Sequence, residues 1–159
     1  MARRTWTSGP FAESARELLV VKDGHIRHGL RAFDDLAARV AAEAGGLVVT
    51  HGEPHPGNLI WAGGQPMLVD WDTVGMAIPE RDLWWIRGDE NALRTYAAAA
   101  GREPSAAALA LYRLRWHLDD VSSFASSLRS PHDRTDDAEH ALRSLNIAIS
   151  LAEEAAAAG

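Results

Sequence analysis

The 159-residue chain contains no cysteine. It therefore forms no disulfide, no thiolate zinc site and no cysteine nucleophile, which is compatible with a reducing cytoplasm. Long hydrophobic runs are also missing. No apolar stretch is long enough to span a bilayer, and the opening Met1–Thr5 leads into none of the apolar residues typical of a signal peptide. We expect a soluble, cytoplasmic protein.

Basic residues are scarce as well. Lys and Arg total 16 against 22 Asp and Glu, the formal net charge is -6, and Lys22 is the only lysine. Binding to nucleic acid or to an anionic membrane depends on clustered positive charge, so we expect neither partner. The hydrophobic fraction of 47% and the charged fraction of 24% are ordinary for a globular protein, and the length suits one domain.

Three blocks of different composition follow one another. Residues 10–46 and 88–159 have apolar residues at helical spacing, whereas residues 47–85 are rich in Gly, Pro, His and Asp. Within the middle block, the short apolar runs 59–61 and 67–69 flank a turn that contains two glycines, which predicts a small β-hairpin. The expected fold is mainly α with a small β-hairpin, in the α+β class.

Apolar residues also predict the buried faces of the helices. They recur at steps of three and four in the first block and in two stretches of the third, where Asp136 and Glu139 suit the capped start of the last helix. The residues expected to be buried are Ile26, Leu30, Phe33, Ala37, Val40 and Ala44, then Leu111, Leu114, Leu118, Val121, Ala125 and Leu128, and finally Ala141, Leu142, Leu145, Ile149 and Ala152.

Two polar clusters lie at the ends of the strands predicted in the middle block. The first reads His-Gly-Glu-Pro-His-Pro-Gly-Asn from His51 to Asn58, and the second is Asp70-Trp71-Asp72. The glycines and prolines of the first cluster exclude a regular helix there, so its side chains belong to a constrained loop. Because the clusters adjoin neighbouring strands, we expect them to converge in space.

Three chemistries could use these residues. A zinc peptidase needs both histidines on one helical turn, which the prolines forbid. A zinc deaminase needs two cysteines besides its His-x-Glu motif, and the chain has none, so both zinc chemistries are excluded. Phosphoryl transfer needs an acid near the incoming hydroxyl and oxygen ligands for magnesium. Glu53, Asn58 and Asp70 supply that set, and Asp72 is a second carboxylate nearby. A metal-dependent hydrolase of phosphate esters that uses Asp70 and Asp72 stays a weaker alternative.

Three segments, in order, resemble the aminoglycoside phosphotransferase and choline kinase-like family. Residues 51–58 resemble its catalytic loop, usually written H-G-D-x-H-x-x-N, and residues 70–72 resemble its metal-binding segment. Pro79-Glu80-Arg81-Asp82-Leu83 resembles its downstream P-x-x-D-L element. Three matches at the family's spacing are more specific than any one of them. The resemblance covers the chain from Pro10 to its end, as the C-terminal lobe of a kinase-like fold.

The resemblance implies an ATP- and Mg²⁺-dependent transfer of a phosphoryl group to a hydroxyl of a small molecule. Glu53 takes the position of the catalytic base. Asn58 and Asp70 are expected to hold Mg²⁺, with Asp72 as a further ligand. Members of this family modify antibiotics, choline and sugars, so antibiotic resistance is among the roles that the resemblance suggests, and the sequence does not name the acceptor.

Other residues are expected to support the site. His51 and His55 shape the catalytic loop, and Asp82 ties the start of a helix to it. By the same resemblance, Asp119 and Asp120 lie in the helical region that helps to form an acidic acceptor pocket in aminoglycoside kinases. The alternative for this acidic pair is a solvated helix face.

Two departures from the family pattern matter. Glu53 stands where the family usually has Asp, and a misplacement of ~1 Å can cost ~10²-fold in rate. The family's N-terminal lobe, which covers the nucleotide, has no counterpart, so residues 1–9 are expected to form a flexible segment and residues 10–159 the C-terminal lobe. We expect a truncated form with little or no activity alone. The alternative is a noncatalytic module of kinase-like ancestry that binds small molecules or associates with itself.

The face that the missing lobe would cover is expected to be apolar. Exposed patches of that kind favour association, so we expect a homodimer or a higher oligomer. Light scattering at micromolar concentration should give at least twice the mass of one 159-residue chain. A monomeric mass would contradict this expectation.

Overall fold

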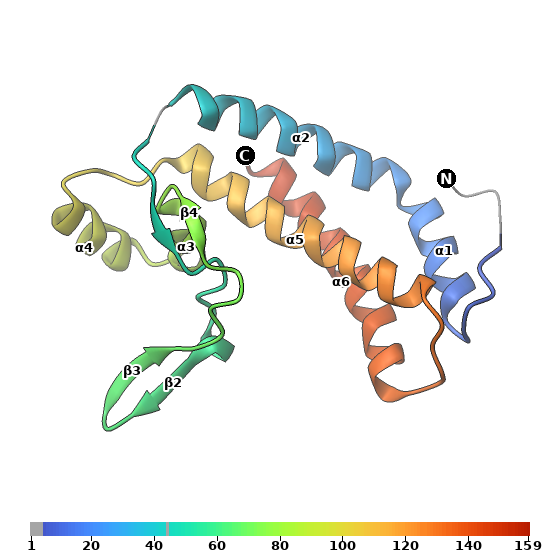
Figure 1. Cartoon of the computed structure of the whole chain (residues 1–159). Helices are drawn as coiled ribbons and strands as arrows, with labels where there is room; N and C mark the ends of the chain where they lie inside the picture. Colours follow the sequence, from blue (N-terminus) through green and yellow to red (C-terminus); the bar gives the residue numbers. More distant parts are fainter. Residues whose placement is uncertain (1–4, 44) are drawn as a thin grey trace. The chain divides into compact units, whose positions relative to one another are not determined.

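A computed structural model describes residues 5–43 and 45–159 (Figure 1). Two predictions from the sequence concern residues that lie wholly or partly outside the described ranges. These are Ala44, at the end of the first predicted apolar stripe, and residues 1–4 of the segment expected to be flexible. The remainder of that segment makes contacts, since the carbonyl of Ser8 accepts a hydrogen bond from the His132 N–H at 3.2 Å.

The described chain divides into two compact units. Residues up to Asp35 form one unit with Leu114–Gly159, and Leu36–Arg113 form the other. Helices predominate, and the strands make two small antiparallel sheets of two strands each. The predicted fold class, mainly α with a small β-hairpin, is confirmed. No helix in the described ranges combines the length and the apolar character needed to cross a membrane.

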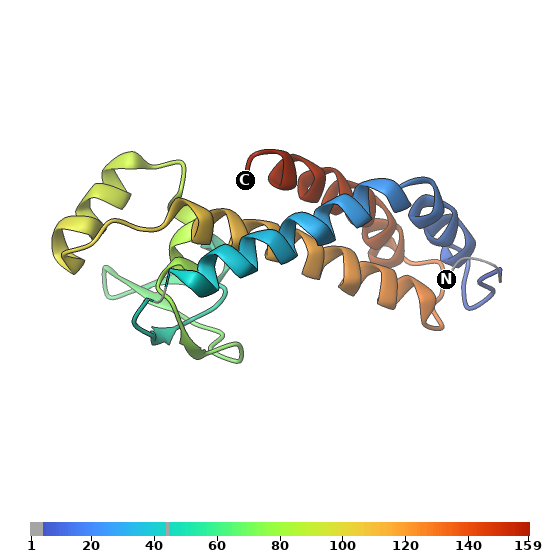
Figure 2. The same cartoon turned by 90° about the horizontal axis from the view of Figure 1, so that it is seen from above.

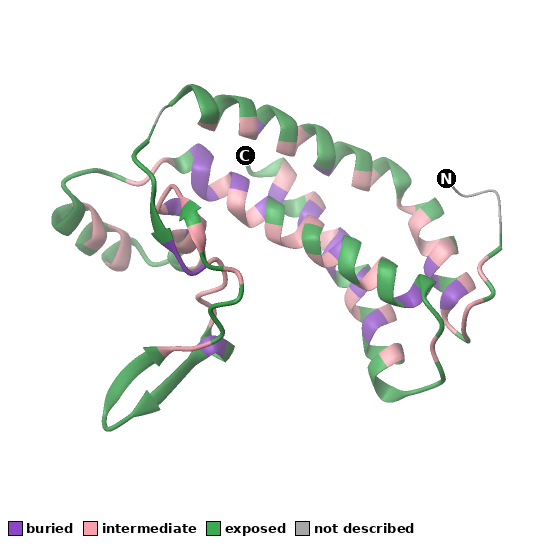
Figure 3. Cartoon of the chain, in the orientation of Figure 1, coloured by how far each residue is buried: buried purple, intermediate pink, exposed green. Residues whose placement is uncertain are grey.

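The first unit is helical. It contains α1 (Ala12–Val21), α6 (Asp136–Ala157), the first part of α2 (Asp23–Ala42) and the last part of α5 (Ala106–Arg129). Figure 2 shows α1 beside α6, as Figure 1 does. Burial of apolar side chains stabilises this unit, as the purple residues along α5 and α6 in Figure 3 illustrate. Its core consists of Ala15, Val121, Leu128, Ala141, Leu145, Ala148 and Ile149.

The stripes predicted on α5 and α6 supply most of this core, but two local predictions are wrong. Leu30 in α2 is 49% exposed, whereas its neighbour Gly29 is buried, with Leu118 3.4 Å from the place that a Cβ would take. A glycine gives no hydrophobic signal, so the pattern selected Leu30 instead. The cap of α6 is Thr135, not Asp136, because the Thr135 side chain accepts a hydrogen bond from the backbone N–H of Ala138.

The second unit holds both sheets. Strand β2 pairs with β3 in the predicted hairpin, whose turn uses Gly63 and Gly64 at positive φ, and β1 pairs with β4, with Thr50 opposite Gly75. Besides the last part of α2 and the first part of α5, its elements are β1 (Val48–Thr50), a 3₁₀ turn (Pro56–Asn58), β2 (Leu59–Ala62), β3 (Gln65–Leu68), β4 (Gly75–Ala77), α3 (Glu80–Leu83), a second 3₁₀ turn (Trp84–Ile86) and α4 (Glu90–Ala100).

Polar residues are buried in the second unit. The buried polar or charged side chains among the described residues are Thr50, His51, Asn58 and Glu80. Burying a polar group costs free energy unless it is hydrogen-bonded. These four residues therefore mark the part of the second unit where buried hydrogen bonds contribute to the structure.

Candidate functional site

One carboxylate holds the loop that follows β1. Asp82, in α3, accepts a hydrogen bond from the His51 N–H on Oδ2 at 2.7 Å and one from the Gly52 N–H on Oδ1 at 2.8 Å. The two carboxylate oxygens thus accept from successive peptide N–H groups. Hydrogen bonds to an ionised acceptor are stronger than those between neutral groups. Asp82 therefore fixes the direction in which the chain leaves β1.

Arg81 fills the space next to Gly52. The φ of Gly52 is 98°, and a Cβ at this position would collide with the Arg81 guanidinium, so the loop requires glycine here. Arg81 Nη1 donates to Thr50 Oγ1 and Nη2 donates to the Thr73 carbonyl, each at 2.7 Å. Arg81 thus ties the end of β1 to the turn before β4.

Both ring nitrogens of the buried His51 are engaged. Nδ1 accepts a hydrogen bond from the Glu53 N–H at 3.2 Å, and Nε2 lies 2.9 Å from the Val69 carbonyl oxygen. A neutral ring nitrogen that accepts carries no proton, so the proton is on Nε2, which donates to Val69. The Trp71 ring packs against His51 with a centroid separation of 4.6 Å. His51 therefore connects the loop to the segment after β3.

The backbone of Glu53 is anchored, while its carboxylate is not engaged. The Glu53 carbonyl accepts hydrogen bonds from the His55 N–H at 2.8 Å and from Asn58 Nδ2 at 2.9 Å. The carboxylate makes no hydrogen bond or ion pair with the other described residues. A fixed backbone thus carries an acid that is available to a partner from outside the chain.

Asn58 and Asp70 adjoin at the base of the β2–β3 hairpin. The Asn58 carbonyl accepts a hydrogen bond from the Val69 N–H at 2.9 Å. Asn58 is 7% exposed, and because its Nδ2 donates to the Glu53 carbonyl, the side-chain amide oxygen is the atom left for a ligand. Asp70 is the one non-glycine residue in the described ranges with a positive φ, 64°. Left-handed backbone at such a residue is uncommon and is concentrated at functional sites.

The oxygen atoms of Asn58 and Asp70 suit a hard cation. Mg²⁺ is usually held by one or two protein carboxylates together with water and phosphate oxygens. One amide oxygen and one unengaged carboxylate at the end of the same hairpin fit that pattern. Over residues 5–43 and 45–159, no three His, Asp or Glu side chains lie close enough together to hold a metal on their own.

Asp72 and His55 border this group. Asp72 is exposed two residues after Asp70, and its carboxylate has no hydrogen bond or ion pair within the part of the chain that the structure describes. His55 Nδ1 accepts a hydrogen bond from the Gly57 N–H at 3.0 Å, which caps the 3₁₀ turn, and its ring lies 5.6 Å from that of Trp85. The contacts of His55 are therefore those of a residue that shapes the loop.

Asp119 and Asp120 belong to the other unit, on α5. The Asp119 carboxylate forms an exposed ion pair with Arg115 one helical turn earlier, at 3.3 Å. Exposed pairs of this spacing contribute little to stability. The expected part of Asp119 and Asp120 in an acceptor pocket stays a prediction.

Two anchors in α3, Arg81 and Glu80, were not predicted from the sequence. The Glu80 side chain is 1% exposed, and its carboxylate accepts hydrogen bonds from Arg102 Nη2 on both oxygens at 2.8 Å and from the Ser105 N–H at 2.9 Å. Burial raises the pKa of Glu80, but these hydrogen bonds outweigh burial and hold the pKa below its ordinary value. The signal in the sequence is the run Glu-Arg-Asp in a segment too short to be a solvated helix face.

The chain belongs to the phosphotransferase enzyme family, whose model matches residues 2–124. This confirms the resemblance found in the sequence. Protein StrN of Streptomyces griseus is 33% identical to this chain over 136 residues, which are 82% of this chain and 39% of that protein.

Two crystal structures of the spectinomycin phosphotransferase APH(9)-Ia have the same fold. The complex with ADP and spectinomycin matches with a TM-score of 0.68 at 15% identity and covers 94% of this chain and 51% of that one. The AMP-bound complex matches with a TM-score of 0.68 at 14% identity over 95% and 51% of the two chains. The chain therefore spans only part of the length of the proteins that it matches.

Replacing Asp82 with Asn tests the anchoring of the loop. An amide has only one oxygen, so the N–H of His51 or of Gly52 loses its acceptor, which costs about 1–3 kcal/mol of unfolding free energy. Native-state hydrogen exchange should show these two amides exchanging faster than in the wild type. Asp72→Asn is the matched control, because the Asp72 carboxylate has no partner among the described residues. Unchanged protection in Asp82→Asn would show that the carboxylate does not hold the loop.

Proposed function

We propose that this chain carries the catalytic loop of an ATP- and Mg²⁺-dependent phosphotransferase that acts on a hydroxyl of a small molecule. The observation that supports this most is a continuous hydrogen-bonded connection. The Glu53 carbonyl is bonded to the Asn58 side chain, and the Asn58 carbonyl is bonded to the N–H of Val69, next to Asp70. Phosphoryl transfer depends on positioning and electrostatics more than on covalent chemistry, so a fixed frame with unengaged oxygens suits it.

Glu53 is the proposed catalytic base. Its carboxylate would accept the proton of the acceptor hydroxyl while the hydroxyl oxygen forms its bond to the γ-phosphorus of ATP, and the bond from that phosphorus to the bridging oxygen would break and release ADP. The hydrogen bonds of the Glu53 backbone to His51 and Asn58 set the position from which the side chain extends. Because Glu is one methylene longer than the usual Asp, we propose that the acceptor hydroxyl sits correspondingly farther from this backbone.

Asn58 and Asp70 are the residues proposed to hold Mg²⁺, with Asp72 as a further ligand. When bound, the ion neutralises charge on the phosphate oxygens. The use of ATP is supported by the adenine nucleotides, ADP and AMP, in the two structures of the spectinomycin enzyme. His51 supports this group indirectly, because its ring bridges the Glu53 N–H and the Val69 carbonyl.

The acceptor is proposed to be a small hydroxylated molecule of the kind that aminoglycoside-type kinases modify. The relation to a spectinomycin phosphotransferase supports this class of acceptor, and Asp119 and Asp120 are the proposed contacts for a cationic one. Since the chain covers 39% of StrN and 51% of the spectinomycin enzyme, we propose that it has little activity on its own.

Calorimetric titration of the chain with ATP and Mg²⁺ tests the proposed ligands. We expect weak, saturable binding that requires Mg²⁺ and falls at least about tenfold in Asp70→Asn, because a neutral amide is a poorer ligand for a hard cation than a carboxylate. Asn tolerates the left-handed backbone of Asp70, so this variant changes the charge with little effect on the conformation.

Glu53→Gln is the matched variant for the proposed base. It leaves the metal ligands in place, so ATP binding should stay within about twofold, while the small phosphoryl transfer of the wild type should fall to the background of a reaction without protein. Equal binding by wild type and Asp70→Asn would contradict the metal assignment. No binding by the wild type would favour the noncatalytic alternative.

A further inference from the structure

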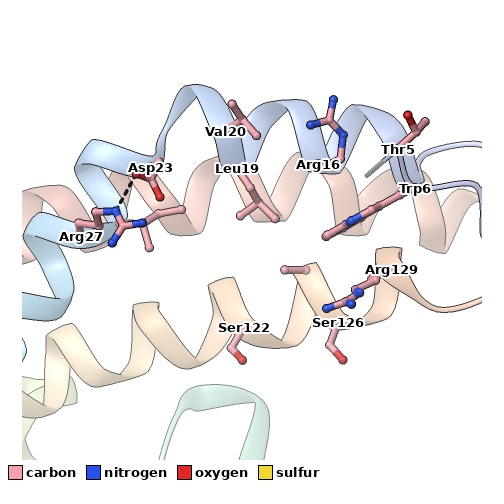
Figure 4. A pocket seen from close by; sticks show the side chains of 12 residues that line it. Thr5, Trp6, Arg16, Leu19, Val20, Asp23, Arg27, Ser122, Ser126 and Arg129 are labelled. Carbon is pink, nitrogen blue, oxygen red and sulfur yellow. Dashed lines mark hydrogen bonds and ion pairs between the residues drawn. The ribbon is translucent and has the colours of Figure 1, made fainter. Parts of the chain in front are cut away.

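The helical unit contains a cavity of about 920 Å³, shown in Figure 4. It lies between the N-terminal segment with α1 and the start of α2 on one side and α5 on the other, and all of its lining residues belong to this one unit. A cavity of such volume can hold a small organic molecule. None of its residues belongs to the candidate site at 51–58 and 70–72.

Trp6 forms one wall of the cavity, and its backbone is fixed. The Trp6 N–H donates to Glu13 Oε2 at 2.9 Å, and Arg16 donates to the same carboxylate at 2.6 to 2.9 Å. The hydrogen bonds from Arg16 and Trp6 lower the pKa of Glu13, so this carboxylate stays ionised and keeps both partners at neutral pH. The indole is therefore a preformed apolar surface.

Among the described residues that line the cavity, Arg129 is the arginine that has no acidic partner. Its guanidinium lies over the Trp6 ring, 5.6 Å from the centroid, and makes no hydrogen bond or ion pair with the described residues. The residues outside the described ranges, 1–4 and Ala44, include no Asp or Glu. Arg129 thus has donors available to an anion from outside the chain.

The other two arginines of the cavity differ from Arg129, because each is neutralised. Arg16 is paired with Glu13, and Arg27 is paired with Asp23 at 2.7 Å. Figure 4 shows Trp6 and Leu19 on the side opposite α5, and Arg129 extending from α5 into the space between. Within the described residues, the cavity therefore combines an apolar interior with the uncompensated positive charge of Arg129.

We propose that this cavity binds a small organic anion, whose apolar body packs on Trp6 and Leu19 and whose single carboxylate or phosphate group pairs with Arg129. A guanidinium binds either oxyanion through two parallel N–H···O hydrogen bonds, so the shared chemistry is an oxyanion on an apolar body. The site is independent of the proposed phosphoryl transfer, since it shares no residue with the loop or with the Mg²⁺ ligands.

NMR titration of the wild-type chain tests this proposal with three probes: 1-naphthoate, 1-naphthyl phosphate and the uncharged 1-naphthylmethanol. At least one of the two anions should saturate the shift of the Trp6 indole N–H signal, which Trp6→Phe assigns, and the stronger anion identifies the preferred oxyanion. The alcohol should bind at least about fivefold more weakly, because it lacks the charge that pairs with Arg129. Equal binding of the alcohol, or no saturable shift at Trp6, would overturn the proposal.

Two arginine variants locate the charge. Arg129→Gln should weaken binding of the preferred anion about tenfold, the loss expected when a hydrogen bond to a charged group is removed. Arg134→Gln is the matched control, because its guanidinium also lies over an aromatic ring, that of Phe11 at 5.1 Å, but does not line the cavity. Binding by this control should stay within about twofold. Unchanged binding in Arg129→Gln would overturn the proposal, and if that variant does not fold, the wild-type comparison of anion and alcohol decides.

Discussion

The candidate site depends on the two hydrogen bonds that the Asp82 carboxylate accepts from His51 and Gly52. One carboxylate can accept from successive peptide groups only where the backbone turns, and the positive φ of Gly52 provides this turn. The path of the loop then brings the His51 ring to the Val69 carbonyl and the Glu53 carbonyl to Asn58. Release of Asp82 would therefore free both connections between the loop and the hairpin.

The four-residue helix α3 holds this region together in three directions. Glu80 binds Arg102 and the start of α5, Arg81 binds the β1–β4 sheet, and Asp82 binds the loop. Because such a short helix has little stability of its own, these contacts hold α3 in its position. The frame that results is hydrogen-bonded throughout, whereas the carboxylates of Glu53 and Asp70 are not engaged within the described residues. That contrast is typical of a ligand site.

Local patterns in the sequence predicted much of the fold. The β2–β3 hairpin follows from two apolar runs around a Gly-Gly turn, and the apolar faces of α5 and α6 follow from helical spacing. The pairing of β1 with β4 joins segments that are far apart in the sequence, since Thr50 lies opposite Gly75, 25 residues later. No local sequence pattern therefore predicts this pairing. Gly29 was missed because close helix packing needs a small residue rather than an apolar one.

The candidate site was predictable to a similar degree. Spacing and resemblance selected Glu53, Asn58 and Asp70, which the backbone hydrogen bonds connect, and their catalytic roles stay predictions. Arg81 and Glu80 were not predicted, because Thr50 lies 31 residues and Thr73 8 residues before Arg81, and Arg102 lies 22 residues after Glu80, so no pattern within one element connects them. A charged residue in a short segment gives no sign of which backbone or side-chain groups it will meet.

Binding of Mn²⁺ tests most directly the proposal that Asn58 and Asp70 form a site for a divalent cation. Mn²⁺ takes the same oxygen ligands as Mg²⁺ and broadens the NMR signals of nearby nuclei. At low Mn²⁺ the amide signals of Asn58, Val69 and Asp70 should broaden first and return on addition of excess Mg²⁺. Uniform broadening, or broadening that begins at Asp119 and Asp120, would contradict the claim.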